Sequence, residues 1–414
     1  MTNKEKQARE ILNKYNQNHI VEWMDKVDRK TKDLIVDQVF DIDFEELERL
    51  YDNVNKVKEK KNYNITPIEV TNKELIDAKQ KEEYYNLGEK VLENNELAII
   101  TLAGGQGTRL GHNGPKGSFK IDIGEKGKYL FEMIIDQLID ANKKYGVTIP
   151  YYIMTSVENN DETIAFFEDN NYFNYPKEYI KFFKQAEEPL VDKFGKLLIN
   201  EDKVIKLASN GNGEIYKSLA KNKILDDMNS KNVKWIVVSG IDNILINLID
   251  PIFIGLTIKQ KNKIASKSII KNTPREGGGV FLKTNGKPVV IEYVEVPEDI
   301  ATKKDSNGEY VYGDINILNH LFKIDALEKI AEKPLPYHTA VKKCTFLDKD
   351  GNPVQDTIYK FEKFIFDAFV YFKDISLLRV KREDEFAPIK NKDGEDSPKT
   401  AKKLYEDFMD SLKK

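Results

Sequence analysis

Short apolar runs alternate with amphipathic stretches along most of the chain. Residues 97–102 form a continuous apolar run that ends in glycines, and residues 235–239 form a second run that ends at Gly240. Between these runs, residues 129–145 carry apolar side chains at helical spacing. Buried parallel strands read as continuous apolar runs, whereas the helices that cover them repeat every three to four residues. The pattern therefore predicts an α/β fold, in which a sheet has helices on both faces.

The same criteria locate the remaining elements. They predict two further strands, at residues 151–155 and 180–183. They also predict helical stretches at residues 1–60, 161–170, 357–373 and 398–413. Asn285-Gly286 lies between two apolar runs, which predicts a β-hairpin. The charged residues 56–62 are expected to form a solvated helix end or linker, and residues 391–396 a flexible loop.

Composition excludes several classes of protein. The chain has 414 residues, and its 65 basic and 69 acidic residues give a net charge of −4, which disfavours a nucleic-acid binder. One cysteine, Cys344, allows neither an internal disulfide nor a Cys-rich zinc site, and the four histidines share no metal-ligand spacing. The first ten residues hold no apolar segment, so we expect no signal peptide. The composition predicts a cytoplasmic protein that does not enter a membrane.

A glycine-rich segment follows the first buried strand. Residues 102–117 read LAGGQGTRLGHNGPKG, and glycines at such a turn let backbone N–H groups approach an anion closely. Arg109 and Lys116 add positive charge, so the segment suggests a phosphate cradle. A dinucleotide-binding G-x-G-x-x-G is one residue shorter than the spacing found here, and a P-loop needs Gly-Lys-Ser/Thr. The string L-x-G-G-x-G-T-R-L with a downstream Pro-Lys instead fits a nucleotidyltransferase loop at every position.

Seven later segments strengthen this interpretation. They lie in one order along the chain, at residues 152–156, 182–185, 211–213, 242–245, 316–320, 360–367 and 382–391. Together with the glycine loop, they make the chain resemble the UDP-sugar pyrophosphorylase family, and within it the branch that uses N-acetylglucosamine 1-phosphate. Three segments depart from the family pattern. Glu214 stands where a glycine is usual, residues 186–189 are more acidic than the pattern, and residues 275–279 read REGGG.

The resemblance implies a fold and a domain plan. We expect a Rossmann-like nucleotidyltransferase core with a mixed, mostly parallel sheet flanked by helices, a helical N-terminal segment and no C-terminal β domain. The predicted regions are a helical region at 1–90, a catalytic core at 91–375 and a C-terminal loop and helix at 376–414.

The resemblance also implies a reaction and assigns roles to residues. UTP and N-acetylglucosamine 1-phosphate would give UDP-N-acetylglucosamine and pyrophosphate, with Mg²⁺, or Mn²⁺ as an alternative, as cofactor. Arg109 is expected to hold the β- and γ-phosphates, Lys116 the α-phosphate and Lys360 the sugar-side phosphate. Asp242 is the expected metal ligand, because Mg²⁺ prefers carboxylate oxygens.

The remaining assignments concern the nucleotide and the sugar. Gln185 offers a donor and an acceptor to the uracil edge. Asn316 is the candidate for the sugar, with Glu292 beside it on the hairpin. The other expected substrate-binding residues are Leu102, Gly104, Gly105, Asn212, Gly213 and Asn243.

Three alternatives stay open at this point. A UTP–glucose-1-phosphate or broad UDP-sugar pyrophosphorylase differs only at the sugar pocket. An inactive nucleotide-sugar binding protein is disfavoured by the presence of Arg109, Lys116, Asp242 and Lys360. A nicotinamide-linked dehydrogenase is disfavoured by the loop spacing. The oligomeric state expected from the resemblance is a monomer.

Overall fold

The computed structural model describes residues 1–54 and 64–413. The chain folds into two compact units, each assembled from three segments. The smaller unit contains Met1–Lys61, Ala186–Glu214 and Leu335–Ile365, and the larger unit contains Asn62–Gln185, Ile215–Pro334 and Phe366–Lys414. The boundaries predicted at residues 91 and 376 stay a prediction, and the charged run 56–62 lies wholly outside the described residues.

A mixed sheet forms the centre of the larger unit. Its main strands lie in the order β2-β18-β12-β15-β11-β3-β6-β7, and every neighbouring pair is parallel except the two made by β15. Their bounds are Thr71–Asn72, Ser376–Arg379, Ile264–Ile270, Asp314–Lys323, Trp235–Gly240, Leu97–Leu102, Tyr151–Thr155 and Ile180–Lys184. All residues of β3, β6 and β11 are buried, which explains their continuous apolar sequences. The predicted mostly parallel sheet is confirmed.

The predicted hairpin extends this sheet. Strands β13 (Gly279–Thr284) and β14 (Lys287–Glu292) pair antiparallel, and β13 also pairs with β15 and with β1 (Ile65–Thr66). The two turn residues have positive φ, 51° at Asn285 and 76° at Gly286. Asn and Gly tolerate this backbone conformation, so the Asn-Gly signal fixes the hairpin at the predicted place.

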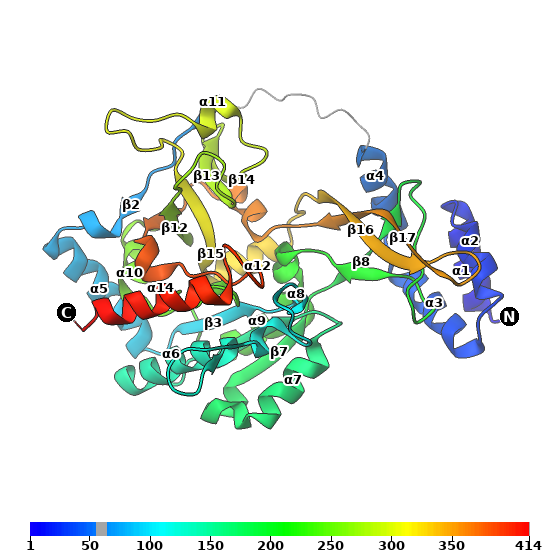
Figure 1. Ribbon diagram of the computed structural model, residues 1–414, viewed down its shortest axis with the longest axis horizontal. Helices are drawn as coiled ribbons and strands as arrows, with labels where there is room; N and C mark the ends of the chain where they lie inside the picture. Colours follow the sequence, from blue (N-terminus) through cyan, green and yellow to red (C-terminus); the bar gives the residue numbers. More distant parts are fainter. Residues whose placement is uncertain (55–63, 414) are drawn as a thin grey trace. The chain divides into compact units, whose positions relative to one another are not determined.

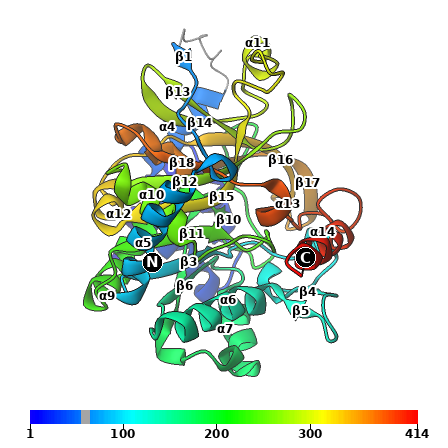
Figure 2. The same cartoon turned by 90° about the vertical axis from the view of Figure 1, so that its left-hand side faces the viewer.

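Helices flank the sheet, as predicted. Figures 1 and 2 both place α6 and α7 beside the β3–β6–β7 end of the sheet. The helices of this unit are α5 (Ala78–Glu93), α6 (Leu130–Tyr145), α7 (Asn160–Asp169), α8 (Ile215–Lys221), α9 (Ile224–Ser230), α10 (Pro251–Lys259), α11 (Glu298–Ala301), α12 (Ile324–Ala331), α13 (Arg382–Glu385) and α14 (Pro398–Ser411). Among the residues described, no helix is both long and apolar enough to cross a bilayer.

Four helices and a long hairpin build the smaller unit. The helices are α1 (Asn3–Lys14), α2 (Asn18–Met24), α3 (Arg29–Asp41) and α4 (Phe44–Val54), which confirms a helical N-terminal segment. Strands β16 (His338–Leu347) and β17 (Pro353–Glu362) form the hairpin, drawn in orange in Figure 1, and β9 (Val191–Asp192) pairs with β17. A separate ladder joins β8 (Glu187–Pro189) to β10 (Leu207–Ser209).

The helix predicted over residues 357–373 is wrong. Residues 357–362 belong to β17, and Ile365–Tyr371 forms the 3₁₀ segment η7. Pairing with β16 runs through ten residue pairs, and Thr, Ile, Tyr and Phe in this stretch suit a pleated strand. Pairing of β17 with β16 therefore overrides the helical spacing of the apolar residues in 357–373.

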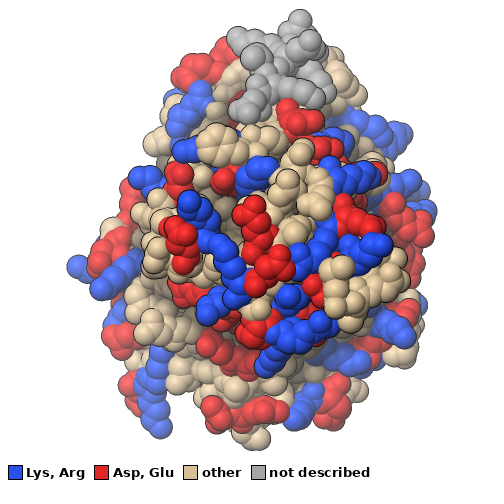
Figure 3. Space-filling view, turned by 90° about the vertical axis from the view of Figure 1, so that its right-hand side faces the viewer, with Lys and Arg blue, Asp and Glu red and all other residues tan. Residues whose placement is uncertain are grey.

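Charges are mixed on one face of the molecule. In Figure 3, which views the face on the right of Figure 1, basic and acidic side chains are interspersed. This distribution differs from the single-sign stripe typical of a nucleic-acid-binding face.

Candidate active site

Backbone hydrogen bonds close the glycine loop on itself. Gly107 N–H donates to Gly114 O at 2.9 Å, and Lys116 N–H donates to Gly105 O at 3.0 Å. Asn159, fully buried at the start of α7, donates its side-chain amide to Ala103 O at 2.9 Å and to Gly105 O at 3.2 Å. These bonds hold the backbone of the loop after β3 in a closed turn.

Gly104 and Gly105 differ in what surrounds them. A Cβ atom on Gly104 would lie 2.9 Å from Gln185 Oε1, whereas a Cβ on Gly105 would meet nothing within 4 Å. Gln185 follows β7 and is 7% exposed, and its side-chain amide has no hydrogen-bond partner among the described residues. The structure thus brings Gln185 to the glycine loop, with its amide available to a ligand.

Lys116 and Asp242 meet where two parallel strands end. Lys116 begins the 3₁₀ turn η3 (Lys116–Ser118) after the glycine loop, and Asp242 lies two residues beyond β11. The Lys116 Nζ–Asp242 Oδ2 distance is 3.6 Å, and the two side chains are 16% and 27% exposed. Ligands of open α/β sheets bind outside the carboxyl ends of the strands. The loop and the carboxylate predicted from the sequence are therefore side by side.

Arg109 lies in the 3₁₀ turn η2 (Thr108–Leu110) and is exposed. Within the described part of the chain it forms no ion pair, so its guanidinium can take an anion. Lys392 is a second cation at this loop that the sequence analysis did not identify. A Cβ on Gly111 would lie 3.5 Å from Lys392 Cδ and 3.8 Å from its Nζ. No local motif marks Lys392, because residues 391–396 meet the loop only through the fold.

Asn243 already binds backbone groups. Its side chain donates to Glu385 O at 2.8 Å and accepts from Ala387 N at 2.8 Å. The neighbouring Asp242 O accepts from Ile389 N at 2.8 Å. These bonds fix the strand end that carries Asp242, and a direct role of Asn243 in substrate binding stays a prediction. Leu102 is buried at the end of β3, and its predicted role is likewise untested.

The residues expected to bind the sugar lie around β15 and the hairpin. Asn316 Oδ1 accepts from Leu318 N at 2.8 Å, and Leu318 has a φ of 56°. This left-handed residue coincides with a register shift between β12 and β15. A Cβ on Gly278 would lie 3.8 Å from Asn316 O, and Glu292 is paired with Gly279 across the hairpin. The structure therefore groups Asn316, Glu292 and the glycines 277–279.

Lys360, Asn212 and Gly213 belong to the smaller unit. Lys360 Nζ lies 2.7 Å from Glu362 Oε1 on the same face of β17. Asn212 Oδ1 accepts from Ile365 N at 2.9 Å, and Gly213 N donates to Lys363 O at 2.9 Å. Asn212 and Gly213 are thus held against the residues that follow Lys360, and the predicted ligand contacts of all three stay predictions.

The departure at Glu214 has a structural explanation. Glu214 Oε2 accepts from Lys363 Nζ at 3.1 Å and from Asn210 Nδ2 at 3.1 Å, and all three side chains are buried. A buried carboxylate needs such partners. Glu214 therefore replaces a glycine without leaving an unpaired charge.

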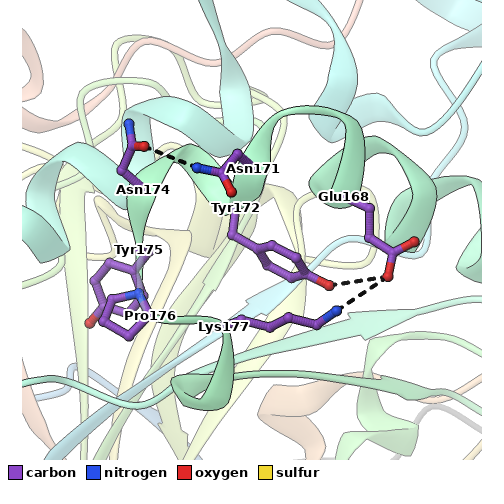
Figure 4. A pocket seen from close by; sticks show the side chains of 7 residues that line it. All are labelled: Glu168, Asn171, Tyr172, Asn174, Tyr175, Pro176 and Lys177. Atoms are coloured by element: carbon purple, nitrogen blue, oxygen red, sulfur yellow. Dashed lines mark hydrogen bonds and ion pairs between the residues drawn. The ribbon is translucent and has the colours of Figure 1, made fainter.

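A separate surface hollow of about 630 Å³ contains none of the predicted site residues. Figure 4 shows its lining, in which Glu168 contacts Tyr172 and Lys177, and Asn171 bonds Asn174. Residues 171–174 all have positive φ, between 48° and 60°. This hollow is a product of the left-handed turn after α7 rather than part of the candidate site.

The site residues fit a magnesium ion held with substrate phosphates. Among the described residues no group of three or more His, Cys, Asp or Glu side chains could enclose a metal. Mg²⁺ is commonly bound through one or two carboxylates, with waters and phosphate oxygens completing its shell. Asp242 is partly exposed and offers such a carboxylate beside the phosphate loop.

Comparison with known proteins agrees with this geometry. The model of the family described as UTP–glucose-1-phosphate uridylyltransferase matches residues 39–396. The chain belongs to this family. It is therefore a nucleotidyltransferase, as predicted from the glycine loop and the seven later segments.

Relatives within the uridylyltransferase family carry more specific names. The UDP-N-acetylglucosamine pyrophosphorylase of Saccharomyces cerevisiae is 36% identical over 82% of this chain and 75% of its own. UDP-N-acetylglucosamine diphosphorylase 2 of Arabidopsis thaliana is 30% identical over 95% of this chain and 82% of its own. The crystal structure of the Trypanosoma brucei uridine diphosphate N-acetylglucosamine pyrophosphorylase, solved with an inhibitor, superimposes with a TM-score of 0.82 at 28% identity. That match covers 98% of this chain and 84% of the other.

Proposed function

We propose that this uridylyltransferase makes UDP-N-acetylglucosamine and pyrophosphate from UTP and N-acetylglucosamine 1-phosphate. The observation that carries the proposal is the approach of Lys116 to Asp242 beside the glycine loop, 3.6 Å apart. A cation and a carboxylate at this place can hold a nucleotide triphosphate and its metal. The sugar follows from the names of relatives that are 30–36% identical over most of the chain.

The reaction is an in-line displacement at phosphorus. A phosphate oxygen of the sugar phosphate attacks the α-phosphorus of UTP, the bond from that phosphorus to the bridging oxygen breaks, and pyrophosphate leaves with the electron pair. The nucleophile is already an anion, so no general base is required. Catalysis rests on bringing two polyanions together and neutralising the charge that develops on the leaving group.

The cations divide this task. Lys116 holds the α-phosphate, and Arg109 in its exposed turn holds the β- and γ-phosphates that become pyrophosphate. Lys360 holds the phosphate of the sugar. Asp242 would hold Mg²⁺, or Mn²⁺ in its place, and the ion would supply positive charge to the phosphate oxygens.

The neutral side chains select the base and the sugar. Gln185, unpartnered among the described residues beside Gly104, reads the uracil edge, and the open space at Gly105 admits the nucleoside. Asn316 and Glu292 contact the sugar, while Asn212 and Gly213 lie near the base or the sugar. A cytoplasmic location and a monomeric state complete the proposal, and a single cysteine suits a reducing compartment.

One alternative is favoured by a specific observation. The family description names glucose 1-phosphate, and the 275–279 loop beside Asn316 departs from the pattern expected for an N-acetylglucosamine enzyme. A glucose-specific or broad UDP-sugar pyrophosphorylase keeps the same chemistry and differs only in this pocket.

The decisive experiment measures pyrophosphate release from UTP and Mg²⁺ with each of the two sugar phosphates. We expect a preference for N-acetylglucosamine 1-phosphate and a loss of at least 100-fold in kcat/KM for Lys116→Ala, about 2.7 kcal/mol in transition-state binding. Lys126→Ala, an exposed lysine between β4 and β5 (Lys120–Ile121 and Lys128–Tyr129), serves as the control. Equal or reversed preference would move the assignment to glucose or to several sugars. Release with neither sugar phosphate would overturn the proposed reaction.

A further inference from the structure

The loop before the hairpin is fastened on two sides by consecutive residues. Arg275 Nη1 donates to Tyr293 O and Val296 O, both at 2.8 Å, which ties the loop to the far end of the hairpin. Glu276 points to a different partner, because its Oε1 accepts from Arg382 Nη2 at 2.6 Å. The loop therefore cannot move relative to Arg382 without breaking a charged hydrogen bond.

Arg382 contacts both the 275–279 loop and the segment around α13. It opens the four-residue helix α13, donates to Ile270 O at 3.1 Å, and its guanidinium lies 5.3 Å from the centre of the Phe386 ring. The Arg382 and Glu276 side chains are 22% and 21% exposed, so the pair is largely shielded from water. Such shielding makes a charge-assisted hydrogen bond stronger and more directional than a surface ion pair.

The segment after Arg382 holds the strand end that carries Asp242. Asn243 bonds both Glu385 O and Ala387 N, and Ile389 N donates to Asp242 O at 2.8 Å. Three hydrogen bonds thus connect Glu385, at the end of α13, and the residues after it to the Asn243 side chain and the Asp242 backbone.

A buried ion cluster makes this connection stiff. Glu385 Oε2 lies 2.5 Å from Lys267 Nζ, and Glu385 Oε1 lies 3.0 Å from Lys73 Nζ. Both lysines also contact Asp250, at 3.0 and 2.8 Å. Glu385, the last residue of α13, is therefore held by two cations.

We propose that Arg382 is a positioning residue that couples the sugar side of the site to the nucleotide side. A shift of the 275–279 loop next to Asn316 moves Glu276 and, through their hydrogen bond, Arg382. The displacement of Arg382 shifts α13 and the residues after it, which hydrogen-bond the strand end that carries Asp242 beside Lys116. The inference rests on the proposed function, since it takes the sugar phosphate and UTP as the two ligands. Binding of one ligand then strengthens binding of the other by the same factor.

The test measures this factor by calorimetry. The dissociation constant of N-acetylglucosamine 1-phosphate is determined with and without α,β-methylene-UTP, whose bridging methylene prevents release of pyrophosphate. We expect a ratio of at least fivefold in the wild-type protein, within the usual range for coupled sites. In Glu276→Gln and Arg382→Met the ratio falls towards one, and the double variant shows no further loss.

A matched variant separates coupling from general damage. Glu298 also pairs with an arginine of this loop, Arg275, but its side chain is 70% exposed and, within the described part of the chain, forms no hydrogen bond or ion pair with Arg382. Glu298→Gln should keep the wild-type ratio, and melting temperatures identify any variant that fails to fold. A wild-type ratio of one, or an unchanged ratio in Glu276→Gln, overturns the inference. Pyrophosphate release by the wild-type protein is measured separately. Failure of the proposed function can therefore be distinguished from failure of this inference.

Discussion

At the scale of single residues, the glycine loop shows which glycines serve packing and which serve a ligand. At Gly104 a Cβ would lie 2.9 Å from Gln185 Oε1, so the end of the Gln185 side chain would have to shift. At Gly105 no protein atom lies within 4 Å of that position. Packing within the described protein therefore leaves space at Gly105 that a ligand can occupy.

This contrast gives a prediction for Gly105→Ala. The added methyl meets no protein atom, so we expect the melting temperature to stay within about 2 °C of the wild-type value, as for a surface substitution worth less than about 0.5 kcal/mol. The methyl would occupy space needed by the nucleoside, so the KM for UTP should rise at least tenfold. Initial-rate kinetics and a thermal melt of the ligand-free protein check both parts. An unchanged KM would show that no ligand uses this space.

Sequence analysis found the residues whose motifs are local and missed those that the fold supplies. Arg109 and Lys116 lie within one loop, and Asp242 follows a recognisable strand, so a short string of letters was enough. Asn159 and Lys392 approach the same loop from other segments, and the motifs near them do not include either residue. Which distant segment reaches a site depends on tertiary packing, which a single sequence does not reveal.

At the scale of elements, two helices approach unusually closely through glycines. A Cβ on Gly255 of α10 would lie 1.7 Å from Tyr84 O of α5, and a Cβ on Gly88 of α5 would lie 1.9 Å from Pro251 O. Backbone atoms cannot yield as a flexible side chain can. The crossing of α5 and α10 therefore depends on the absence of side chains at these two positions.

We accordingly expect Gly255→Ala to destabilise the protein by about 2 kcal/mol or more, because the two helices must separate and repacking a filled core costs about 1–3 kcal/mol. Helix propensity would oppose this effect, since Ala favours a helix over Gly by about 1 kcal/mol. Denaturant unfolding measures the balance. Lys81→Ala, on the exposed face of α5, is the control and should change stability by less than about 0.5 kcal/mol. A stabilised Gly255→Ala protein would show that the helices have room to shift.

The predicted elements succeeded where the local pattern and the tertiary environment agree. Strands β3, β6 and β11 are mostly apolar and are buried on both sides, and α6 has its apolar stripe against the core. The failure at residues 357–373 occurred where the pattern suited a helix but residues 357–362 pair with six residues of β16. A long hairpin whose strands are only partly buried carries too weak an alternation to be recognised.

At the scale of the whole molecule, four segments far apart in sequence are joined by one buried cluster of charges. Lys73, Asp250, Lys267 and Glu385 form ion pairs with N–O distances of 2.5–3.0 Å, and Lys267 is fully buried. Burial raises the pKa of Asp250, but the ammonium groups of Lys267 and Lys73 outweigh this effect and lower its pKa below the ordinary value. Asp250 therefore keeps its charge, and the ion pairs join β12, α10 and α13.

Removing one member should be costly. Lys267→Met leaves two buried carboxylates with one lysine, and we expect a loss of about 3–5 kcal/mol in the free energy of unfolding, as for other broken buried pairs. Lys263→Met is a matched control just before β12, since Lys263 and its partner Asp325 are both 39% exposed. An exposed pair contributes about 0–1 kcal/mol, so the control should lose little. Equal losses in the two variants would show that burial of the cluster does not increase its contribution to the free energy of unfolding.

A buried histidine, His320, makes the stability of the protein depend on pH. His320 lies in β15, bonds Ser266 Oγ through Nδ1 at 2.7 Å, and has no partner at Nε2 among the described residues. Burial lowers the pKa of His320 to about 3, below its value of about 6.5 in the unfolded chain. Between these values only the unfolded state binds the proton, so stability falls as the pH drops from about 6.5 towards 3.

This linkage predicts a measurable difference between the wild-type protein and His320→Leu. On lowering the pH from 7.5 to 5.0, the histidine alone should remove about 2 kcal/mol from the free energy of unfolding, since 1.5 pH units below 6.5 correspond to about 1.36 kcal/mol each. The leucine variant cannot take up this proton, so its loss over the same interval should be smaller by that amount. Other groups, including the partly buried His19, titrate in both proteins and cancel in the comparison. Denaturant unfolding at the two pH values measures each loss. Identical losses would mean that the folded protein admits the proton, and that His320 is less shielded than its position in the sheet requires.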